Sequence, residues 1–223
     1  MTLSIAAWDE RSGQLGAAIA SSSISVAARC LHWRSGVGIA LSQNITDPRL
    51  GPRLLALLAD GVDANAAMDA VRHSTPHIAY RQLGLVDNTG NTSRFTGDAV
   101  LGCFASGEGR HCVAVGNLLE NDGVPAAMIR AFEQASGSLG ARLLEALRAG
   151  AEAGGEAGPL HSAGLLLGGE PSWPLAELRI DWSPDPIAAI VEGWAVYEPQ
   201  IDDYVLRAYN PVEAPSYGVP GDP

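Results

Sequence analysis

Residues 1–23 read MTLSIAAWDERSGQLGAAIASSS, and this stretch sets the expectation for the whole fold. The segments 2–8 and 14–20 have β character and flank a polar turn over 9–13, which together predict a hairpin. The many small residues of both segments favour strands that are packed closely on both faces. The chain is therefore expected to begin with two strands of a sheet that is covered on both faces.

The register of this hairpin decides which side chains lie beside the start of the chain. A turn centred near Arg11 places Thr2 opposite Ala20. The hydroxyl groups of Ser21 and Ser22 then lie just past that point. We therefore expect a cluster of hydroxyl groups around the amino end of the first strand.

Length and composition are those of one domain. The chain has 223 residues, of which 47% are hydrophobic, and this is enough for one large core. We predict a single domain over residues 1–209 and a C-terminal tail over residues 210–223. The tail contains prolines and tyrosines, and its tyrosines favour docking over disorder.

Charge and cysteine content exclude several classes of function. The net charge is −11, which argues against a nucleic-acid partner, because such proteins neutralise phosphates with Lys and Arg. All 14 basic residues are arginine, so chemistry that depends on lysine is excluded. Three cysteines without C-x-x-C spacing (Cys30, Cys103 and Cys112) predict reduced, mostly buried thiols in a cytoplasmic protein. We see no signal peptide and no membrane-spanning run, and we expect no membrane partner.

Downstream of the hairpin, strands and pairs of helices alternate. The expected elements are a third strand over 36–43, helices that open after Pro52 and at Asp63, strands around the turn 88–90 and at 111–117, helices over 124–135 and 138–149, two further strands, and helices over 186–197 and 201–209. Hairpins followed by paired helices predict an α/β (α+β) fold with two mainly antiparallel sheets between helical layers.

No common catalytic or metal-binding motif is present in the sequence. His73 and His77 have helical spacing, but Pro76 lies between them and breaks the shared helix face. We therefore expect no metal and no cofactor. The glycine-rich stretch GAEAGGEAGPLH (150–161) is interpreted as a surface loop.

Thr2 directly follows the initiator methionine, and this position suggests a nucleophile. Methionine aminopeptidases remove Met1 when the second residue is small, which would leave a free α-amino group on Thr2. An α-amine has a pKa of about 7.7–8.0 and can take the proton of the hydroxyl group on the same residue. If Met1 is retained, this base does not exist. The alternative interpretation is an ordinary strand that begins with Thr.

Several blocks of the sequence resemble the bacterial and archaeal DUF1028 proteins over nearly the whole chain. They are MTLSIAAWDERSGQLGAAIAS, GVGIALSQNITDPRLGPRLLALLADG, RQLGLVD, VGNLL, SAGLLL and YVLRAYNPVEAPSYGVPGD. The resemblance implies a fold like that of the N-terminal nucleophile (Ntn) hydrolases, a four-layer α/β/β/α sandwich. It implies no well-defined activity.

The same resemblance implies roles for individual residues. Thr2 falls where an Ntn hydrolase has its nucleophile, and Ser21 and Ser22 fall where such enzymes often keep a polar orienting group. The lysine that proteasome-like members have at the start of the third strand is absent, and Arg29 stands in that region with a far higher pKa. Family blocks that often read HTG and QGN are FTG (Phe95) and VGN (Val115) in this chain.

The function that we expect is an Ntn-type amidohydrolase that acts on a small amide or ureido compound. Thr2 would attack, and Ser21, Ser22, Gln43, Asn44 and Asn117 would supply hydrogen bonds. Arg29, Arg49 and Arg53 would bind a substrate carboxylate. Two alternatives stay open: a non-catalytic module that binds a metabolite or cell-wall fragment, and a structural homo-oligomer with the tail placed on a neighbour.

Overall fold

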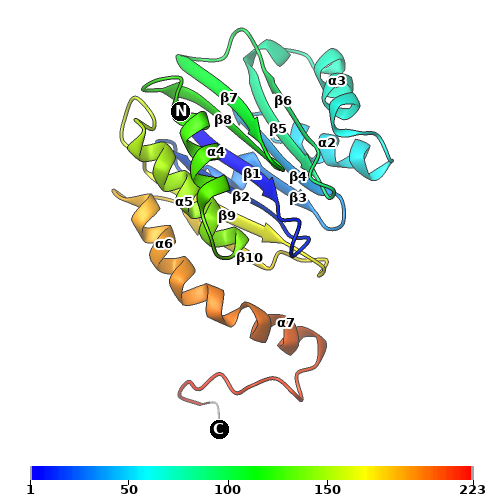
Figure 1. Ribbon diagram of the computed structural model, residues 1–223, viewed down its shortest axis with the longest axis vertical. Helices are drawn as coiled ribbons and strands as arrows, with labels where there is room; N and C mark the ends of the chain where they lie inside the picture. The colour runs from blue at the N-terminus through cyan, green and yellow to red at the C-terminus, as the bar shows by residue number, and fades with distance from the viewer. Residues whose placement is uncertain (1, 222–223) are drawn as a thin grey trace.

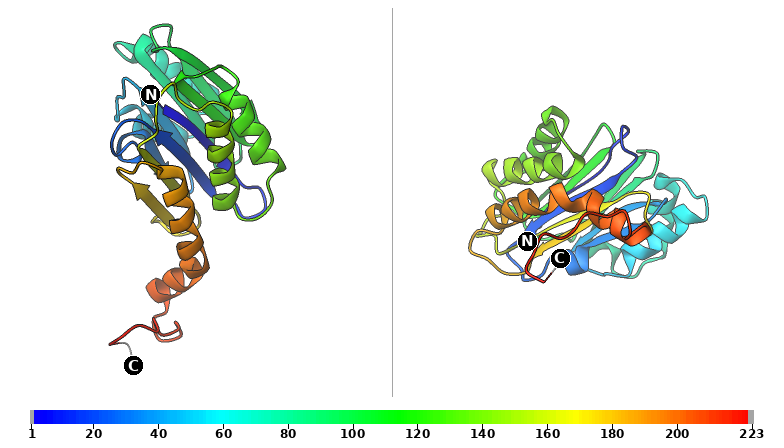
Figure 2. Two further views of the ribbon diagram at one scale, coloured as in Figure 1. Left: turned by 90° about the vertical axis from the view of Figure 1, so that its left-hand side faces the viewer. Right: turned by 90° about the horizontal axis from the view of Figure 1, so that it is seen from below.

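Two antiparallel sheets stack face to face between helical layers in the computed structural model, which describes residues 2–221 (Figures 1 and 2). The larger sheet has six strands in the order β10-β9-β2-β1-β8-β7, and the smaller has four in the order β3-β4-β5-β6. Helices α4, α5 and α6 cover the outer face of the larger sheet, and α2 and α3 cover the smaller one. The predicted α/β/β/α sandwich is thus confirmed.

The strands and helices have the following bounds. The strands are β1 Thr2–Trp8, β2 Leu15–Ser21, β3 Leu31–Arg34, β4 Gly38–Asn44, β5 Arg81–Asp87, β6 Thr92–Thr96, β7 Cys103–Gly109, β8 Cys112–Leu119, β9 Ser162–Gly168 and β10 Ala176–Ile180. The helices are α1 Ala27–Cys30, α2 Leu50–Ala59, α3 Ala64–Ser74, α4 Val124–Gln134, α5 Leu139–Glu152, α6 Pro186–Tyr197 and α7 Ile201–Tyr209, with short 3-10 turns at Ile78–Tyr80 and Glu198–Gln200.

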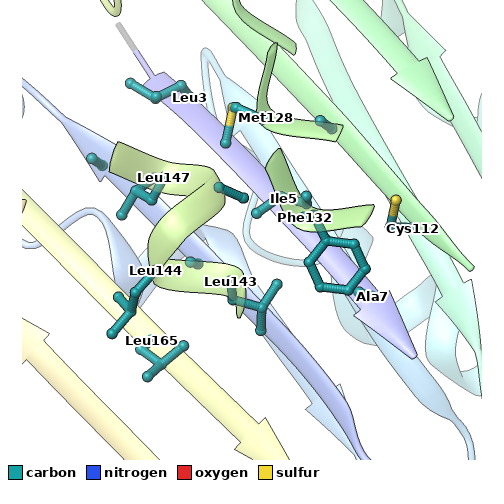
Figure 3. Close-up of a cluster of buried hydrophobic side chains, with 14 of the residues drawn as sticks. Leu3, Ile5, Ala7, Cys112, Met128, Phe132, Leu143, Leu144, Leu147 and Leu165 are labelled. Carbon is teal, nitrogen blue, oxygen red and sulfur yellow. The ribbon is translucent and has the colours of Figure 1, made fainter. Parts of the chain in front are cut away.

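The first strand lies in the middle of the larger sheet, and its two faces contact different layers. Leu3, Ile5 and Ala7 pack against α4 and α5, as Figure 3 shows around Phe132. Ala6 faces the other way and packs between the two sheets. This alternation is the period of two that a β-strand imposes. The core is therefore divided, with one cluster under α4 and α5 and another between the sheets.

The predicted hairpin exists, but its register was wrong by one residue. Leu3 pairs with Ala20, so Thr2 lies beside Ser21 rather than opposite Ala20. The turn is closed by a hydrogen bond from the Asp9 backbone N to the Gln14 carbonyl (2.9 Å), and it is not centred at Arg11. Because the side-chain period is two, this shift decides which serine shares a face with Thr2.

The smaller sheet carries the second helical layer. The side chain of Asp63 caps α3 by accepting hydrogen bonds from the backbone N atoms of Asn65 and Ala66, as the sequence predicted. Leucines of α2, among them Leu54 and Leu55, pack on the outer face of this sheet. The inner face of β4 and β5 is turned toward β1, β2 and β8.

Two local predictions need correction. The region of Arg29, where the family resemblance implies the start of a third strand, lies in the short helix α1. The short edge strand β3 follows it at once and precedes the predicted third strand, which is β4. The segment LHWR of β3 is too short to show a periodic pattern, and it could therefore not be predicted.

Helix α7 and the tail continue beyond the sandwich, past the end of α6 (Figures 1 and 2). No residue of α7 is buried. In the tail, the Pro215 carbonyl accepts a hydrogen bond from Arg207 Nη2 (3.0 Å), and the Arg207 guanidinium lies 3.9 Å from the centre of the Tyr217 ring. The described part of the tail thus contacts α7, while the predicted domain limits stay a prediction.

Candidate functional site

Polar side chains replace apolar ones where the space between the sheets reaches the amino end of β1. Thr2 and Ser4 have the same parity as Ala6, so their side chains face the smaller sheet. Asn117 of β8 is paired directly with Thr2, and the register of β1 and β2 places Ser21 on the other side. Three neighbouring strands therefore present Ser21, Thr2 and Asn117 in one row. Thr2 is 4% exposed, and both neighbours are fully buried.

The smaller sheet meets this row with two glutamines. Ser4 Oγ donates to Gln43 Oε1 (2.6 Å), and Gln43 Nε2 donates to Gln82 Oε1 (2.9 Å). The same Gln82 oxygen accepts from Asn117 Nδ2 (3.1 Å), while Gln82 Nε2 donates to the Gly116 carbonyl (2.9 Å). A connected amide network thus joins the two sheets, and Gln82 is its centre. Such networks fix the orientation of each member.

One acceptor in this network is left without a partner among residues 2–221. Asn117 Oδ1 is buried and receives no hydrogen bond from the described residues. An unsatisfied buried acceptor costs about 1–3 kcal/mol. The next residue, Leu118, has a φ of 53°, which is an uncommon backbone conformation for a bulky side chain. The end of β8 therefore carries both an unsatisfied group and local strain beside Thr2.

A buried carboxyl group lies at the same end of the sheet. Glu156 is 6% exposed, and its two carboxylate oxygens accept from the backbone N of Ser22 at 3.2 and 3.1 Å. Its own backbone forms an isolated antiparallel bridge with Leu119 at the end of β8. Since β1 lies between β2 and β8, Glu156 reaches across the amino end of β1.

Burial raises the pKa of the Glu156 carboxyl from 4.5 to about 7. Hydrogen bonds from Ser22 and Ser21 and the positive charge of the amino terminus act in the opposite direction and are weaker. A serine relay extends from this site toward the surface: Ser21 Oγ lies 2.8 Å from Ser23 Oγ, which accepts from Arg29 Nη2 at 3.3 Å. A carboxyl group that titrates near neutral pH is typical of a functional site.

The other residues that the sequence proposed lie at the periphery. Asn44 ends β4, where its Nδ2 donates to the Tyr80 carbonyl and its Oδ1 accepts from the Leu101 backbone. The remaining two arginines have protein partners away from Thr2. Arg49 is paired with Asp47 at 2.8 Å, and Arg53 donates to the hydroxyls of Ser74 and Thr75. Of the predicted set, Ser21, Ser22, Gln43 and Asn117 come together around Thr2, and Arg29 reaches them through Ser23.

Sequence reasoning missed Ser4, Gln82 and Glu156. Ser4 of β1 and Gln82 of β5 alternate with their neighbours in the way expected of inward-facing side chains, but the sequence does not show which strands of the two sheets face one another. The stretch 150–161 was interpreted as a surface loop, and this was wrong in two respects. Helix α5 continues to Glu152, and Glu156 is buried. The sequence contains one weak signal for Glu156: its neighbours are Gly and Ala, and such small residues allow other segments to pack closely against the backbone there.

The hollows found elsewhere on the described surface do not coincide with this site. One of ≈ 630 Å³ lies at the opposite end of β1 and is lined by Trp8, Asp9, Glu10, Arg11, Arg110, His111, Glu133, Ala135 and Arg142. Its arginines are balanced by acidic residues, and Thr2 does not line it. This hollow is therefore separate from the buried polar network, where Asn117 Oδ1 is unsatisfied and the pKa of Glu156 is raised.

Metal-binding clusters, membrane-spanning helices and disulfides are not found in the described part of the chain. Among residues 2–221 no cluster of three or more His, Cys, Asp or Glu side chains could hold a metal ion. None of the helices described has both the length and the apolar character needed to cross a bilayer. The three cysteines are free thiols, and Cys103 is exposed while Cys30 and Cys112 are buried.

Comparison with known proteins agrees with the fold. The crystal structure of protein SPO2555 from Silicibacter pomeroyi is similar, with a TM-score of 0.82 and 32% identity over 89% of this chain and 88% of that one. Anbu (ancestral beta-subunit) from Yersinia bercovieri matches with a TM-score of 0.41 and 14% identity over 91% and 96% of the two chains, a likeness too low to extend to the site. No curated protein matches.

A family model that is described as a family of unknown function, DUF1028, matches residues 2–190. The match includes every residue of the buried polar network and Glu156. It ends inside α6 and leaves α7 and the tail outside. With this match and the similarity to SPO2555, the chain belongs to the DUF1028 family.

Proposed function

We propose that the protein is an Ntn-type amidohydrolase that acts on a small amide or ureido compound with Thr2 as its first residue. The nucleophile is the Thr2 hydroxyl, and the base is the α-amino group that removal of Met1 frees. The observation that carries this proposal is the unsatisfied Asn117 Oδ1, which is buried directly across the strand pair from Thr2. It is an acceptor placed for a donor that a ligand brings.

The chemistry of that acceptor favours a substrate with an N–H group. A buried amide carbonyl that lacks a partner is satisfied by an amide or urea N–H, and a ligand without such a donor would leave it unpaired. Gln82 holds the Asn117 side chain in place through its hydrogen bond to Nδ2. Amide and ureido compounds carry this donor next to the carbonyl that Thr2 attacks.

The reaction conserves protons within the site. The Thr2 hydroxyl oxygen bonds to the substrate carbonyl carbon, and its proton passes to the α-amine. The resulting ammonium then returns that proton to the leaving nitrogen as the C–N bond breaks. Water, which loses a proton to the amine, attacks the ester that remains and regenerates the Thr2 hydroxyl. Thr2 is 4% exposed, and its α-amine can act as the base only after Met1 has been removed.

The test uses an untagged chain that is released from a cleavable fusion so that Thr2 is its first residue. It is screened against small amides and ureido compounds, and product formation is measured. We expect that Thr2→Ala abolishes turnover and that Thr2→Ser retains part of it. Thr89→Ala, in an exposed turn at the far end of the sandwich, is the matched control and should keep full turnover.

Each other outcome has a definite meaning. Turnover by Thr2→Ala equal to that of the unmodified chain would refute the nucleophile. Ligand binding without turnover in either form would support the alternative, a non-catalytic binding module. The three cysteines form no disulfide, which is usual in a reducing compartment, so we propose a cytoplasmic location, and fractionation of cells that produce the protein checks this.

A second candidate function, assembly into a homo-oligomer, is favoured by the exposed apolar side chains of α6 and α7. Val196 of α6 is 68% exposed, and Tyr209 of α7 is 64% exposed. Helix α6 is apolar over most of its surface, so part of an apolar face is left uncovered. Light scattering on the full chain and on a chain that ends at residue 200 tests this candidate. A monomer in both cases would exclude it.

A further inference from the structure

Glu156 is held at the start of β1 by its backbone as well as by its side chain. The Ala157 backbone N donates to the Leu118 carbonyl at 3.0 Å, and the Glu120 backbone N donates to the Gly155 carbonyl at 3.1 Å. These bonds tie the segment to the end of β8. The carboxylate reaches Ser22, one residue past the end of β2. Both strands that border β1 are therefore tied to this one residue.

The carboxylate has hydrogen-bond donors but no basic side chain as a partner. Among residues 2–221 the ion pairs of the structure do not include Glu156. On the elements packed around it, the charged or titratable residues are Glu120 beyond β8, His161 before β9, and Arg29, which is separated from it by Ser23 and Ser21. A buried carboxylate is stable as an ion when a cation pairs with it.

We infer that, in the chain whose first residue is Thr2, the Glu156 carboxylate pairs with the α-amino group of Thr2. Glu156 is then the positioning residue for that amine. The inference rests on the proposed function for its choice of Thr2 as the first residue. The topology supports it, because a group at the start of β1 lies between the end of β8 and Ser22, the two places to which Glu156 is bound.

The role that follows is electrostatic. The α-amine becomes an ammonium when it takes the hydroxyl proton, and a neighbouring carboxylate stabilises that charge. A buried carboxylate does the same for the imidazolium of a Ser-His-Asp triad. Ser21, which also donates to Glu156, lies on the other side of the same site and keeps the carboxylate oriented.

The lysine-free composition makes a direct measurement possible. All 14 basic residues are arginine, so the α-amino group is the only primary amine of the untagged chain. We would follow its acetylation by limiting acetic anhydride as a function of pH, with the mass of the N-terminal peptide, which contains no cysteine, as the readout. The rate reports the fraction of neutral amine and hence the pKa of that one group.

We expect the amine of the native chain to have a pKa above the ordinary value of about 7.7–8.0. Glu156→Gln keeps a carbonyl acceptor for the Ser22 backbone N and removes the charge, and it should lower the pKa of the amine by about 1 unit or more. Glu152→Gln is the control, because Glu152 is exposed on α5 and paired with Arg148, and it should leave the amine pKa unchanged. Equal pKa values in the unmodified and Glu156→Gln chains would overturn the inference.

A second measurement keeps the inference open to refutation if Glu156→Gln does not fold. The same titration is then made on the unmodified chain with and without 8 M urea (about the concentration that unfolds most domains). The pKa of the amine must be higher in the folded chain than in the unfolded one. Equal values would again overturn the inference.

The kinetic readout separates this inference from the proposed function. If a substrate is found, Glu156→Gln should reduce kcat more than it changes KM, and the acidic limb of the pH profile should move to lower pH. If the proposed function is wrong, Thr2→Ala does not change turnover, but Glu156→Gln still lowers the pKa of the amine. Failure of the inference appears as an unchanged amine pKa, while Thr2→Ala still abolishes turnover.

Discussion

Ionisation of Glu156 should make the folded protein less stable as the pH rises, and Glu156→Gln should remove this effect. The side chain is 6% exposed, and burial raises its pKa from 4.5 to about 7 in the full chain. At 1.36 kcal/mol for each pKa unit, this difference corresponds to about 3 kcal/mol. The change from carboxyl to amide keeps the size of the side chain and an acceptor for the Ser22 backbone N.

The sign follows from the order of the two pKa values. Below about pH 4.5 the carboxyl is neutral in the folded and unfolded chains, so its ionisation costs nothing. Between 4.5 and about 7 the unfolded chain loses the proton first, and the free energy of unfolding falls as pH rises. Above about 7 both states are charged, and the full loss of about 3 kcal/mol remains.

The assay is urea unfolding of both proteins at half-unit steps from pH 4.5 to 8.5, extrapolated to zero denaturant. The quantity to compare is the free energy of unfolding of the variant minus that of the unmodified protein. It should grow by about 3 kcal/mol over this range, since all other titrating groups cancel in the difference. Glu152→Gln, on the exposed face of α5, should give a flat difference.

A difference curve that is flat for Glu156→Gln would refute the reasoning. So would a curve that falls with pH, because it would mean that the charged carboxylate is better stabilised in the folded protein than in water. Chains with identical first residues must be compared, since the positive charge of the amino terminus lowers the pKa of Glu156.

Three further results are expected. Gly168→Ala should lower stability by about 1–3 kcal/mol in thermal unfolding, because the added Cβ would lie 1.9 Å from the Trp33 ring. Gln82→Leu should cost about 2 kcal/mol or more in urea unfolding, since it removes the partner of Asn117 and leaves buried amides unsatisfied; a neutral result would mean that water replaces it. A thiol reagent should label Cys103 rapidly in the native protein, and the two buried thiols only after unfolding; uniform labelling would contradict their burial.

The layers could be predicted from the sequence because each element carries its own signal. The pairs of helices have apolar stripes and local caps, such as Asp63 before α3 and Ser138 before α5. The first two strands are marked by small and β-branched residues on each side of a polar turn. Signals of this kind are contained in one segment and need no knowledge of its neighbours.

The site could be predicted only in part, because its members meet through the stacking of two sheets. Asn117 was proposed from the end of its own strand, and the pairing of β1 with β8 places it beside Thr2. Gln82 has no local signal, since its role depends on which face of β5 turns toward β8. The hairpin register was wrong because the loop between Asp9 and Gln14 has an even number of residues (10–13), whereas a turn centred at Arg11 requires an odd number.

The two ends of β1 hold buried acids in opposite electrostatic states, and this contrast is the strongest argument for function at the amino end. At the carboxyl end, burial acts to raise the pKa of Asp9, but a hydrogen bond from Ser12 and the charges of Arg11 and Arg142 hold it below 3.8. Arg142 lies 3.1 Å from Asp9, so a cation pairs with this buried acid and holds it in its charged form.

At the amino end, burial prevails and raises the pKa of Glu156 to about 7. A protein with 14 arginines has placed none in an ion pair with this residue among those described, and it has left Asn117 Oδ1 unsatisfied nearby. Packing alone would be better served there by the apolar residues that fill the rest of the space between the sheets, such as Val113 and Val115. The uncompensated Glu156 carboxylate and the unsatisfied Asn117 Oδ1 thus lower the stability of the fold at this position. A free amine would compensate the first, and a substrate amide would satisfy the second.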